Sequence, residues 1–196
     1  MADYLNNNYQ FKPHRKVMLF IDGENMVCRY QAMITQGLVP KQPEIHFHDK
    51  DVYIWTPLKI FTEESEYHNE IIRAYYYTSV IGDDIKLNSV FNNIKNIQIL
   101  ATTPQTLYPV IFKKVRKEIK AKCVDIQMTV DILSHVYQNN IDTVCLFSGD
   151  GDYLPVVKEI ISKGKRILIG AFSNGLHSSL IQLADAVINL DTVFFN

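Results

Sequence analysis

The chain has 196 residues, and its 20 Lys and Arg residues nearly balance its 21 Asp and Glu residues, for a formal net charge of -1. This balance excludes a uniformly basic coat for nucleic acid, so any polyanion site must come from local clustering. With 47% hydrophobic and 21% charged residues, the composition is that of a globular chain and excludes a disordered or collagen-like one. One domain with one substantial core is expected.

Three cysteines lie far apart in the sequence and form no Cys-x-x-Cys pair. A disulfide framework or a zinc ribbon is therefore not expected, and a reducing, cytoplasmic environment fits better. The N-terminal residues are polar and contain no apolar stretch of the kind found in a secretion signal. The longest apolar runs are far shorter than the roughly 20 residues that cross a bilayer, so no membrane association is expected.

The two ends of the chain are predicted to be tails around one domain. Residues 1–15 are polar and rich in asparagine, and residues 192–196 follow the last predicted element. The domain, 16–191, opens with a short apolar run at 16–21, which predicts a strand buried on both faces of a parallel sheet. Residues 37–69 are rich in proline and glutamate, and they predict an insertion or a lid on a compact sheet.

Predicted strands and helices alternate along the rest of the chain. Further strands are expected at 71–80, 97–101, 141–147, 165–172 and 186–190, and helices at 24–35, 84–95, 125–139, 153–163 and 175–184. Residues 105–122 form an alternating stretch that is expected at a sheet edge or on an extended arm. The order of elements is typical of β-α-β units and predicts the α/β class: a single three-layer α/β/α domain with a mainly parallel central sheet.

Carboxylates follow two of the predicted strands. Asp22 comes after the strand at 16–21, Asp150 comes after the strand at 141–147, and Asp152 lies two residues further on. Because ligands of open parallel sheets bind beyond the carboxyl ends of the strands, Asp22 and Asp150 are expected to meet if their strands are neighbours. The alternative is that Asp22 and Asp152 cap the helices that follow them.

Carboxylates that are packed together repel one another, so such a group either holds protons or recruits a cation. Magnesium prefers oxygen ligands from a few carboxylates and waters, which suits substrates that carry phosphate. No Cys or His accompanies these acids, and this ligand set favours Mg²⁺ or Mn²⁺ over zinc. His46 and His48 could share one face of a strand, but they lack ligand partners beyond Asp49 and Asp51, and a zinc site there is not favoured.

Four motifs occur in order along the chain. They read FIDGEN at 20–25, RAYYYTS at 73–79, KCVDIQMTVDIL at 122–133 and FSGDGDYLPVVKEIISKGKRI at 147–167, with AFSNGLHSSLIQLADAVINLD following at 171–191. Together they resemble the NYN-domain family in its LabA-like branch, a group within the PIN-like ribonuclease fold. The resemblance covers 16–191 apart from the insertion, and it implies a PIN-like, Rossmann-like domain with metal-dependent ribonuclease activity.

The resemblance also implies a set of catalytic and metal-binding residues. The acidic positions of the family fall on Asp22, Asp125, Asp150 and Asp152, and its asparagine after the first strand falls on Asn25. Asp131 matches a further acidic position, but six residues past Asp125 it faces away on a regular helix, so Asp125 is favoured. The chain departs from the family at Cys123, where glycine is usual, and in the length of 37–69.

These residue types predict a division of roles. Asp22 and Asp150 are expected to ligate Mg²⁺ or Mn²⁺, Asp125 and Asp152 to add direct or water-mediated ligands, and Asn25 to orient a carboxylate or a phosphate oxygen. Such an ion lowers the pKa of a bound water and neutralises the charge that grows on the scissile phosphate.

A basic segment leads into the helix that carries Asp125. Residues 113–122 hold six basic residues and one acid, a local charge of +5. We expect this segment to hold the phosphates of RNA near the acids, and the tyrosines at 75–77 to offer stacking faces if they are exposed. The alternative is a solvated charged edge that discourages sheet aggregation. The predicted RNA-binding residues are Lys113, Lys114, Arg116, Lys117, Lys120 and Lys122.

The favoured function is a metal-dependent endoribonuclease that hydrolyses RNA phosphodiester bonds. An RNA-binding or scaffold protein of the same fold, with little hydrolysis, is the alternative. A Toprim-like phosphotransfer enzyme ranks last, because such folds end their first strand in Glu and this chain has Asp22 there. A homodimer is left open, since no heptad or exposed apolar stripe specifies an interface.

Overall fold

The computed structural model describes residues 13–41, 68–99, 105–114 and 122–196. Most of the predicted N-terminal tail and of the predicted insertion lies outside these residues. The strands are β1 (His14–Asp22), β2 (His68–Val80), β3 (Gln98–Ile99), β4 (Gln105–Lys113), β5 (Thr143–Phe147), β6 (Arg166–Ala171) and β7 (Ala186–Asn189). The helices are α1 (Gly23–Thr35), α2 (Asp84–Lys95), α3 (Lys122–Tyr137), α4 (Leu154–Ser162), α5 (Ser178–Leu183) and α6 (Asp191–Phe194), with a 3-10 helix at Gly151–Tyr153.

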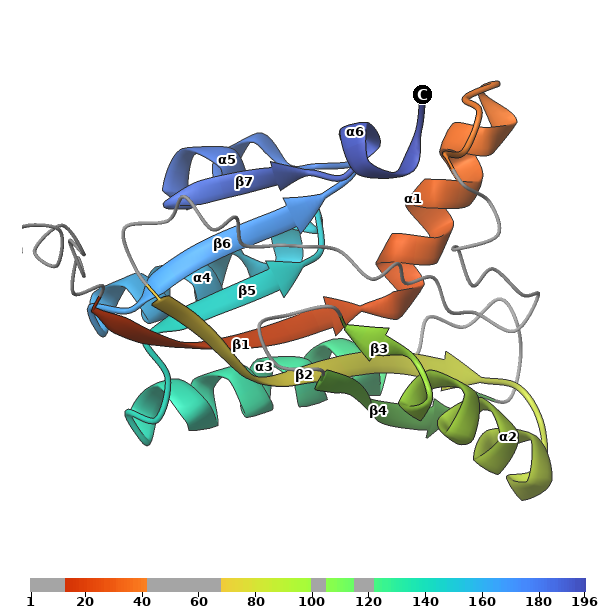
Figure 1. Ribbon diagram of the computed structural model, residues 1–196, viewed down its shortest axis with the longest axis horizontal. Coiled ribbons are helices and arrows are strands. Elements are labelled where there is room, and N and C mark those ends of the chain that lie inside the picture. Colours follow the sequence, from red (N-terminus) through yellow and green to blue (C-terminus); the bar gives the residue numbers. More distant parts are fainter. Residues whose placement is uncertain (1–12, 42–67, 100–104, 115–121) are drawn as a thin grey trace, which may run out of the picture.

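All seven strands form one sheet in the order β3-β4-β2-β1-β5-β6-β7 (Figure 1). Every neighbouring pair is parallel except β3 and β4, so the predicted α/β class with a mainly parallel sheet is confirmed. The first half of 105–122, which was expected at an edge or on an arm, forms β4 between β2 and the two-residue strand β3. Since β3 pairs only with Gln105 and Thr106, the rest of β4 has, among the described residues, a neighbouring strand on the β2 side alone.

The central strand β1 supplies both cores of the domain. Val17, Leu19 and Ile21 pack on one face of the sheet, and Met18 and Phe20 pack on the other, as successive side chains of a strand do. Buried residues of α1, α2 and α6 cover the first face, and buried residues of α3, α4 and α5 cover the second. This is the predicted three-layer α/β/α arrangement; Figure 1 shows the sheet on its face, with α4 behind β5 and β6.

Residues 192–196 are packed and do not form the predicted tail. Phe194 and Phe195 are buried, and their ring centroids lie 5.8 and 5.1 Å from that of Tyr30 on α1. The Asn196 N–H donates a hydrogen bond to the carbonyl oxygen of Val39 at 3.1 Å. Burial of a phenylalanine side chain stabilises a fold by about 2 kcal/mol, which holds this segment against α1.

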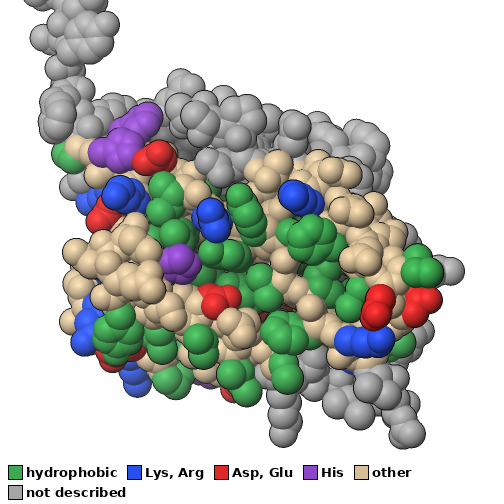
Figure 2. Space-filling view, turned by 90° about the horizontal axis from the view of Figure 1, so that it is seen from below, with side chains coloured by type: hydrophobic (Ala, Val, Ile, Leu, Met, Phe, Trp, Pro, Cys, Tyr) green, Lys and Arg blue, Asp and Glu red, His purple; other side chains and the backbone are tan. Residues whose placement is uncertain are grey.

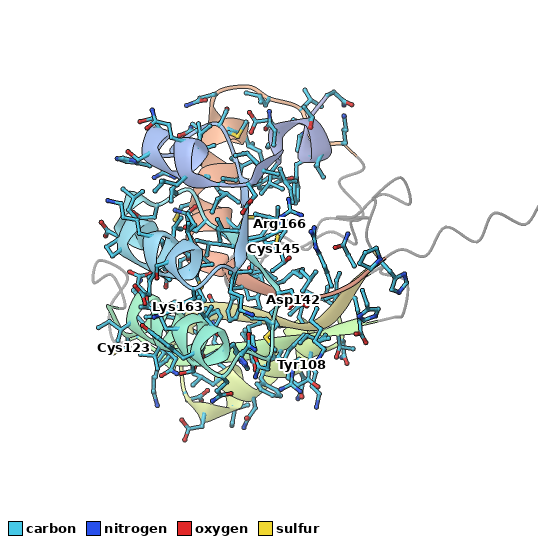
Figure 3. All side chains as sticks on the ribbon, turned by 90° about the vertical axis from the view of Figure 1, so that its left-hand side faces the viewer. Tyr108, Cys123, Asp142, Cys145, Lys163 and Arg166 are labelled. Carbon is cyan, nitrogen blue, oxygen red and sulfur yellow. The ribbon has the colours of Figure 1, made fainter. Side chains whose placement is uncertain are left out.

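The three cysteines are free thiols. Cys145 is buried in the sheet and Cys123 is exposed on α3, and the two are well separated in Figure 3. Within the described ranges, no helix is both long enough and apolar enough to span a bilayer.

Candidate active site

Asp22 lies at the carboxyl edge of the central strand, with only 4% of the residue exposed. Because β1 pairs in parallel with β5, the strands that precede Asp22 and Asp150 are neighbours. The Asn25 N–H donates to Asp22 Oδ1 at 3.0 Å, and the Ser148 hydroxyl donates to Oδ2 at 3.2 Å. Asp22 therefore caps α1, as the alternative interpretation expected, and it also binds the loop that follows β5.

Burial is the main cause that raises the pKa of Asp22, from 3.8 to about 7. The charges of Asp125 and Glu24 raise this pKa as well, while the hydrogen bonds from the Asn25 N–H and Ser148 oppose the rise. The protonated form of this carboxyl group is therefore favoured far more than it is for an exposed aspartate. A cation beside it would favour the charged form.

Three carboxylates from separate elements act together on the buried hydroxyl of Tyr153. This hydroxyl donates to Asp125 Oδ1, in the first turn of α3, at 3.3 Å. Burial is the largest cause that raises the pKa of Tyr153, and the charges of Asp22, Asp125 and Asp150 add to it. The Tyr153 hydroxyl is therefore neutral, and the charges of all three acids act on it.

The loop after β5 presents Asp150 and Asp152 differently. Asp150 Oδ1 accepts from the Asp152 N–H at 3.0 Å and so caps the 3-10 helix, while the Asp150 N–H donates to Ser148 Oγ at 3.2 Å. Asp152 is exposed, and within the described residues its carboxylate accepts no hydrogen bond. The cap that the sequence suggested for Asp152 thus belongs to Asp150, because the turn begins earlier, at Gly151.

Asn25 holds this loop in place. Its Oδ1 accepts from the Gly149 N–H at 3.3 Å, and the Gly149 carbonyl accepts from the His177 N–H at 3.0 Å. Gly149 leaves no room for a side chain, since a Cβ there would lie 2.9 Å from the carbonyl oxygen of Gly175. Asn25 therefore orients the backbone that carries Asp150, where the sequence predicted that it would orient a carboxylate or a phosphate.

Asp131, the second acid of α3, is engaged elsewhere. It accepts from the Tyr77 hydroxyl and from the Gln127 side-chain amide, both at 2.8 Å. Burial raises the pKa of Tyr77, and the hydrogen bond to Asp131 raises it further. The bond from Tyr77 joins α3 to β2, and the bond from Gln127 lies within α3.

A second polar group borders the acids. Glu24 accepts a hydrogen bond from the Ser79 hydroxyl and forms an ion pair with Lys114, whose Nζ lies 3.6 Å from Glu24 Oε1. The Lys114 side chain is only 16% exposed. Sequence reasoning missed four residues that contact the site, although all four lie inside the quoted motifs: Glu24, Ser79, Ser148 and Tyr153.

The predicted basic segment can be placed only in part. Lys113 Nζ lies 3.2 Å from Asp84 Oδ1, so Lys113 and Lys114 each form an ion pair with an acid. Lys122 opens α3, but its side chain is not among those described. The predicted residues that lie outside the described ranges are Arg116, Lys117, Lys120, His46 and His48.

The donor chemistry at this edge suits a hard divalent cation. The donors are carboxylate oxygens, and the raised pKa of Asp22 reports both its burial and repulsion from Asp125. Within the described part of the chain, no three His, Cys, Asp or Glu side chains are grouped closely enough to hold a metal ion as they stand.

Comparisons with known proteins agree with this architecture. The chain matches the NYN domain over residues 16–191. The uncharacterized protein MJ0482 of Methanocaldococcus jannaschii is 32% identical over 77 residues, which cover 39% of this chain and 32% of that protein. The chain thus spans about a third of the length of this curated relative. The crystal structure of a protein of unknown function, VPA0982 from Vibrio parahaemolyticus RIMD 2210633, has a TM-score of 0.59 at 16% identity, covers 93% of this chain and 96% of its own, and shows the fold alone.

Proposed function

The chain belongs to the NYN-domain family, a group of PIN-like nucleases, and from this premise we propose that it is a metal-dependent endoribonuclease. Its reaction is the hydrolysis of phosphodiester bonds in RNA at the carboxyl edge of the sheet. Within the family, the quoted motifs support the LabA-like branch. The free cysteines support a reducing, cytoplasmic location.

The observation that carries this proposal is the convergence of three acids on Tyr153. Asp22, Asp125 and Asp150 come from two strand ends and one helix start, and each contributes to the raised pKa of the Tyr153 hydroxyl. A fold gains no stability from bringing like charges together. Their convergence is therefore best explained by a ligand of opposite charge.

The proposed cofactor is Mg²⁺ or Mn²⁺. Asp22 and Asp150 would hold it, with Asp125 and the exposed Asp152 as direct or water-mediated ligands. When bound, the ion supplies a water of lowered pKa and neutralises charge on the scissile phosphate.

Other groups of the chain position this chemistry. The Tyr153 hydroxyl holds Asp125 by its hydrogen bond, and the Asn25 N–H and Ser148 hydroxyl hold one oxygen each of Asp22. Lys114, fixed by Glu24, brings a positive charge to the same edge, where it can bind a phosphate of the substrate.

The proposal of RNA as substrate is supported by the local charge of +5 over residues 113–122, which ends at the helix that carries Asp125. One observation favours the alternative of an RNA-binding protein with little hydrolysis. The acids of the described residues are not grouped closely enough to hold an ion as they stand. The two functions share the same nucleic-acid surface and differ in whether a metal makes the site active.

The deciding experiment is cleavage of a labelled mixed RNA pool by the purified chain in EDTA, Mg²⁺ or Mn²⁺. Asp150→Asn is the test variant, and Asp142→Asn is the matched control, since Asp142 lies at the opposite, amino edge of the sheet (Figure 3). We expect cleavage with metal, no cleavage in EDTA, loss of cleavage in Asp150→Asn and full activity in Asp142→Asn. Equal cleavage by Asp150→Asn and the parent would place the active site elsewhere. RNA binding without cleavage would favour the scaffold.

A further inference from the structure

Two side chains on neighbouring strands form a flat, positively charged surface beside the proposed active site. Arg73 on β2 holds its guanidinium carbon 4.3 Å from the centre of the Tyr108 ring on β4, and 5.8 Å from that of Tyr75. Tyr108 is 42% exposed, whereas Tyr76 and Tyr77, which the sequence offered as stacking faces, are fully buried. Tyr75 is half-buried, so the most accessible aromatic face in this region is that of Tyr108.

We propose that this surface, the Arg73–Tyr108 platform, is a subsite that stacks an unpaired base of the RNA. The inference rests on the proposed function, because it adds a binding subsite to the same site. Guanidinium planes and aromatic rings both stack on the flat faces of exposed bases. In a duplex those faces are covered by neighbouring base pairs, and the platform would have nothing to stack on.

The platform lies on the same face of the sheet as the acids. Tyr75 belongs to the core on the α3 side, as do Val110 and Phe112, and Tyr108 alternates in step with these two residues of β4. The next position on that side is Lys114, which pairs with Glu24 beside Asp22. A strand of RNA laid along β4 from the platform thus runs toward the carboxylates.

The distance to the acids suits a few nucleotides. Tyr108 pairs with Tyr75, and Tyr77, two residues further along β2, pairs with Asp22. The platform therefore lies about 7 Å behind the level of Asp22 along the strands, and β4 is two strands, or about 10 Å, away from β1. One base can occupy the platform while the backbone a short way along reaches the acids.

The charge of the platform favours RNA over a second protein surface. Within the described ranges, no carboxylate forms an ion pair with Arg73. The face of the molecule drawn in Figure 2 shows hydrophobic side chains with Lys and Arg side chains, and also Asp and Glu side chains, scattered among them. A guanidinium that pairs with no carboxylate of the described residues and lies on an aromatic ring fits a partner that offers both an anionic backbone and a stacking surface.

A matched control lies on the same chain. Tyr137 on α3 is 60% exposed, and Lys163 Nζ lies 4.9 Å from the centre of its ring, so this pair also joins a cation to an exposed tyrosine. Here, however, Glu159 neutralises the pair, since it accepts from the Tyr137 hydroxyl at 2.6 Å and lies 3.4 Å from Lys163. The Tyr137–Lys163 pair therefore has the same kind of contact between a cation and a ring, but its positive charge is neutralised by Glu159.

The test is binding of a fluorescein-labelled oligouridylate, and of an RNA duplex of the same length, to the full chain in EDTA, which prevents metal-dependent cleavage. We expect Tyr108→Ala to weaken oligouridylate binding by about 5- to 100-fold, the loss typical of one stacked base, and to leave duplex binding unchanged. Tyr108→Phe retains the ring and should bind as the parent does. Arg73→Lys should lose part of the affinity, and Tyr137→Ala should lose none.

Unchanged oligouridylate binding by Tyr108→Ala would overturn the proposal. A difference in sedimentation between the RNA-free Tyr108→Ala variant and the RNA-free parent would also overturn the proposal, because the platform would then be a self-association surface. If Tyr108→Ala does not fold, Tyr108→Leu fills similar space without a ring and must show the same loss. Cleavage assays separate the two proposals. Tyr108-dependent binding without metal-dependent cleavage overturns only the nuclease, and cleavage with unchanged Tyr108→Ala binding overturns only the platform.

Discussion

The two edges of the sheet differ in what surrounds their acidic residues. At the amino edge, acids are matched with donors. Asp142 accepts from the Lys16 N–H at 2.9 Å, and Asp185 lies 3.7 Å from the guanidinium of Arg166. Asp142 and Arg166 are both labelled in Figure 3, which views the sheet from this side. These contacts join neighbouring elements and cost little charge repulsion.

At the carboxyl edge, acids are brought toward one another. Asp22 is buried with Asp125 close enough to raise its pKa, and Asp150 adds its charge at Tyr153. Such an arrangement destabilises the chain unless a proton or a cation is taken up. The comparison indicates that the amino edge serves stability and that the carboxyl edge serves ligand binding.

The largest expected effect separates the two acids of α3. Asp125→Asn should lower the rate of metal-dependent RNA cleavage by about 100-fold or more, because it removes charge from the site, and should leave the fold intact. Asp131→Asn removes the charge that accepts from Tyr77 and Gln127, and should instead lower the free energy of unfolding by about 1 kcal/mol. Cleavage rates and urea unfolding of both variants are the measurements. A larger loss of cleavage in Asp131→Asn would reverse the assignment.

The next effect concerns stability in the absence of metal. Because the pKa of Asp22 is about 7 in the folded chain and 3.8 as its ordinary value, the folded state holds the proton more tightly. Stability therefore falls as pH rises from about 4 to 7 and the cost is complete above 7. Asp22→Asn removes this charge but loses the bond from Ser148, so we expect a net gain of about 2 kcal/mol at pH 8.

Thermal unfolding in EDTA at several pH values checks this prediction. The Asp22→Asn variant should melt higher than the parent at pH 8, and near pH 4, where only the lost bond from Ser148 remains, it should melt slightly lower. Asp142→Asn, at the amino edge, should show no such gain at pH 8. If Asp22→Asn melts lower than the parent at pH 8, the buried charge is balanced within the chain and the contrast between the edges fails.

Sequence reasoning reached the fold because its signals are local. The apolar run at 16–21 predicted a strand buried on both faces, and β1 is such a strand. The helix predicted at 84–95 has the bounds of α2, where Asp83 caps the first turn by accepting from the Lys86 N–H. The position of β4 within the sheet was not predicted. An alternating pattern of polar and apolar residues shows which side chains share a face of the strand, but it carries no information on which strands lie beside it.

For the site, the sequence identified acids that follow strands and missed the groups that hold them. Asp22 and Asp150 could be identified from the sequence because their position after an apolar strand is a local signal. The bond from Tyr153 to Asp125 joins residues 28 apart, and that from Ser79 to Glu24 joins residues 55 apart. Such pairs depend on how strands and helices are stacked, which a single sequence does not reveal.

A smaller effect concerns the positive charge at the carboxyl edge. Lys114 is mostly buried against Glu24, whereas Lys113 is 56% exposed and pairs with Asp84, which is 88% exposed. If Lys114 binds a substrate phosphate, Lys114→Gln should reduce the slope of log affinity for RNA against log salt concentration by about 1. It should also lower cleavage at subsaturating RNA. Lys113→Gln is the control, and an equal loss of cleavage in both variants would mean that only the overall charge matters.

The smallest effect tests the amino edge. Asp142→Ala removes the acceptor for the Lys16 N–H, and because this contact is exposed to solvent we expect a loss of about 0.5 kcal/mol in the free energy of unfolding, measured in urea. Metal-dependent cleavage should be unchanged, since the substituted residue lies at the far end of β5 from Asp150. A loss of cleavage that exceeds the loss of stability would show that the two edges are coupled through β1 and β5. In that case the amino edge would take part in positioning Asp22, and the division between a stabilising edge and a ligand-binding edge would no longer hold.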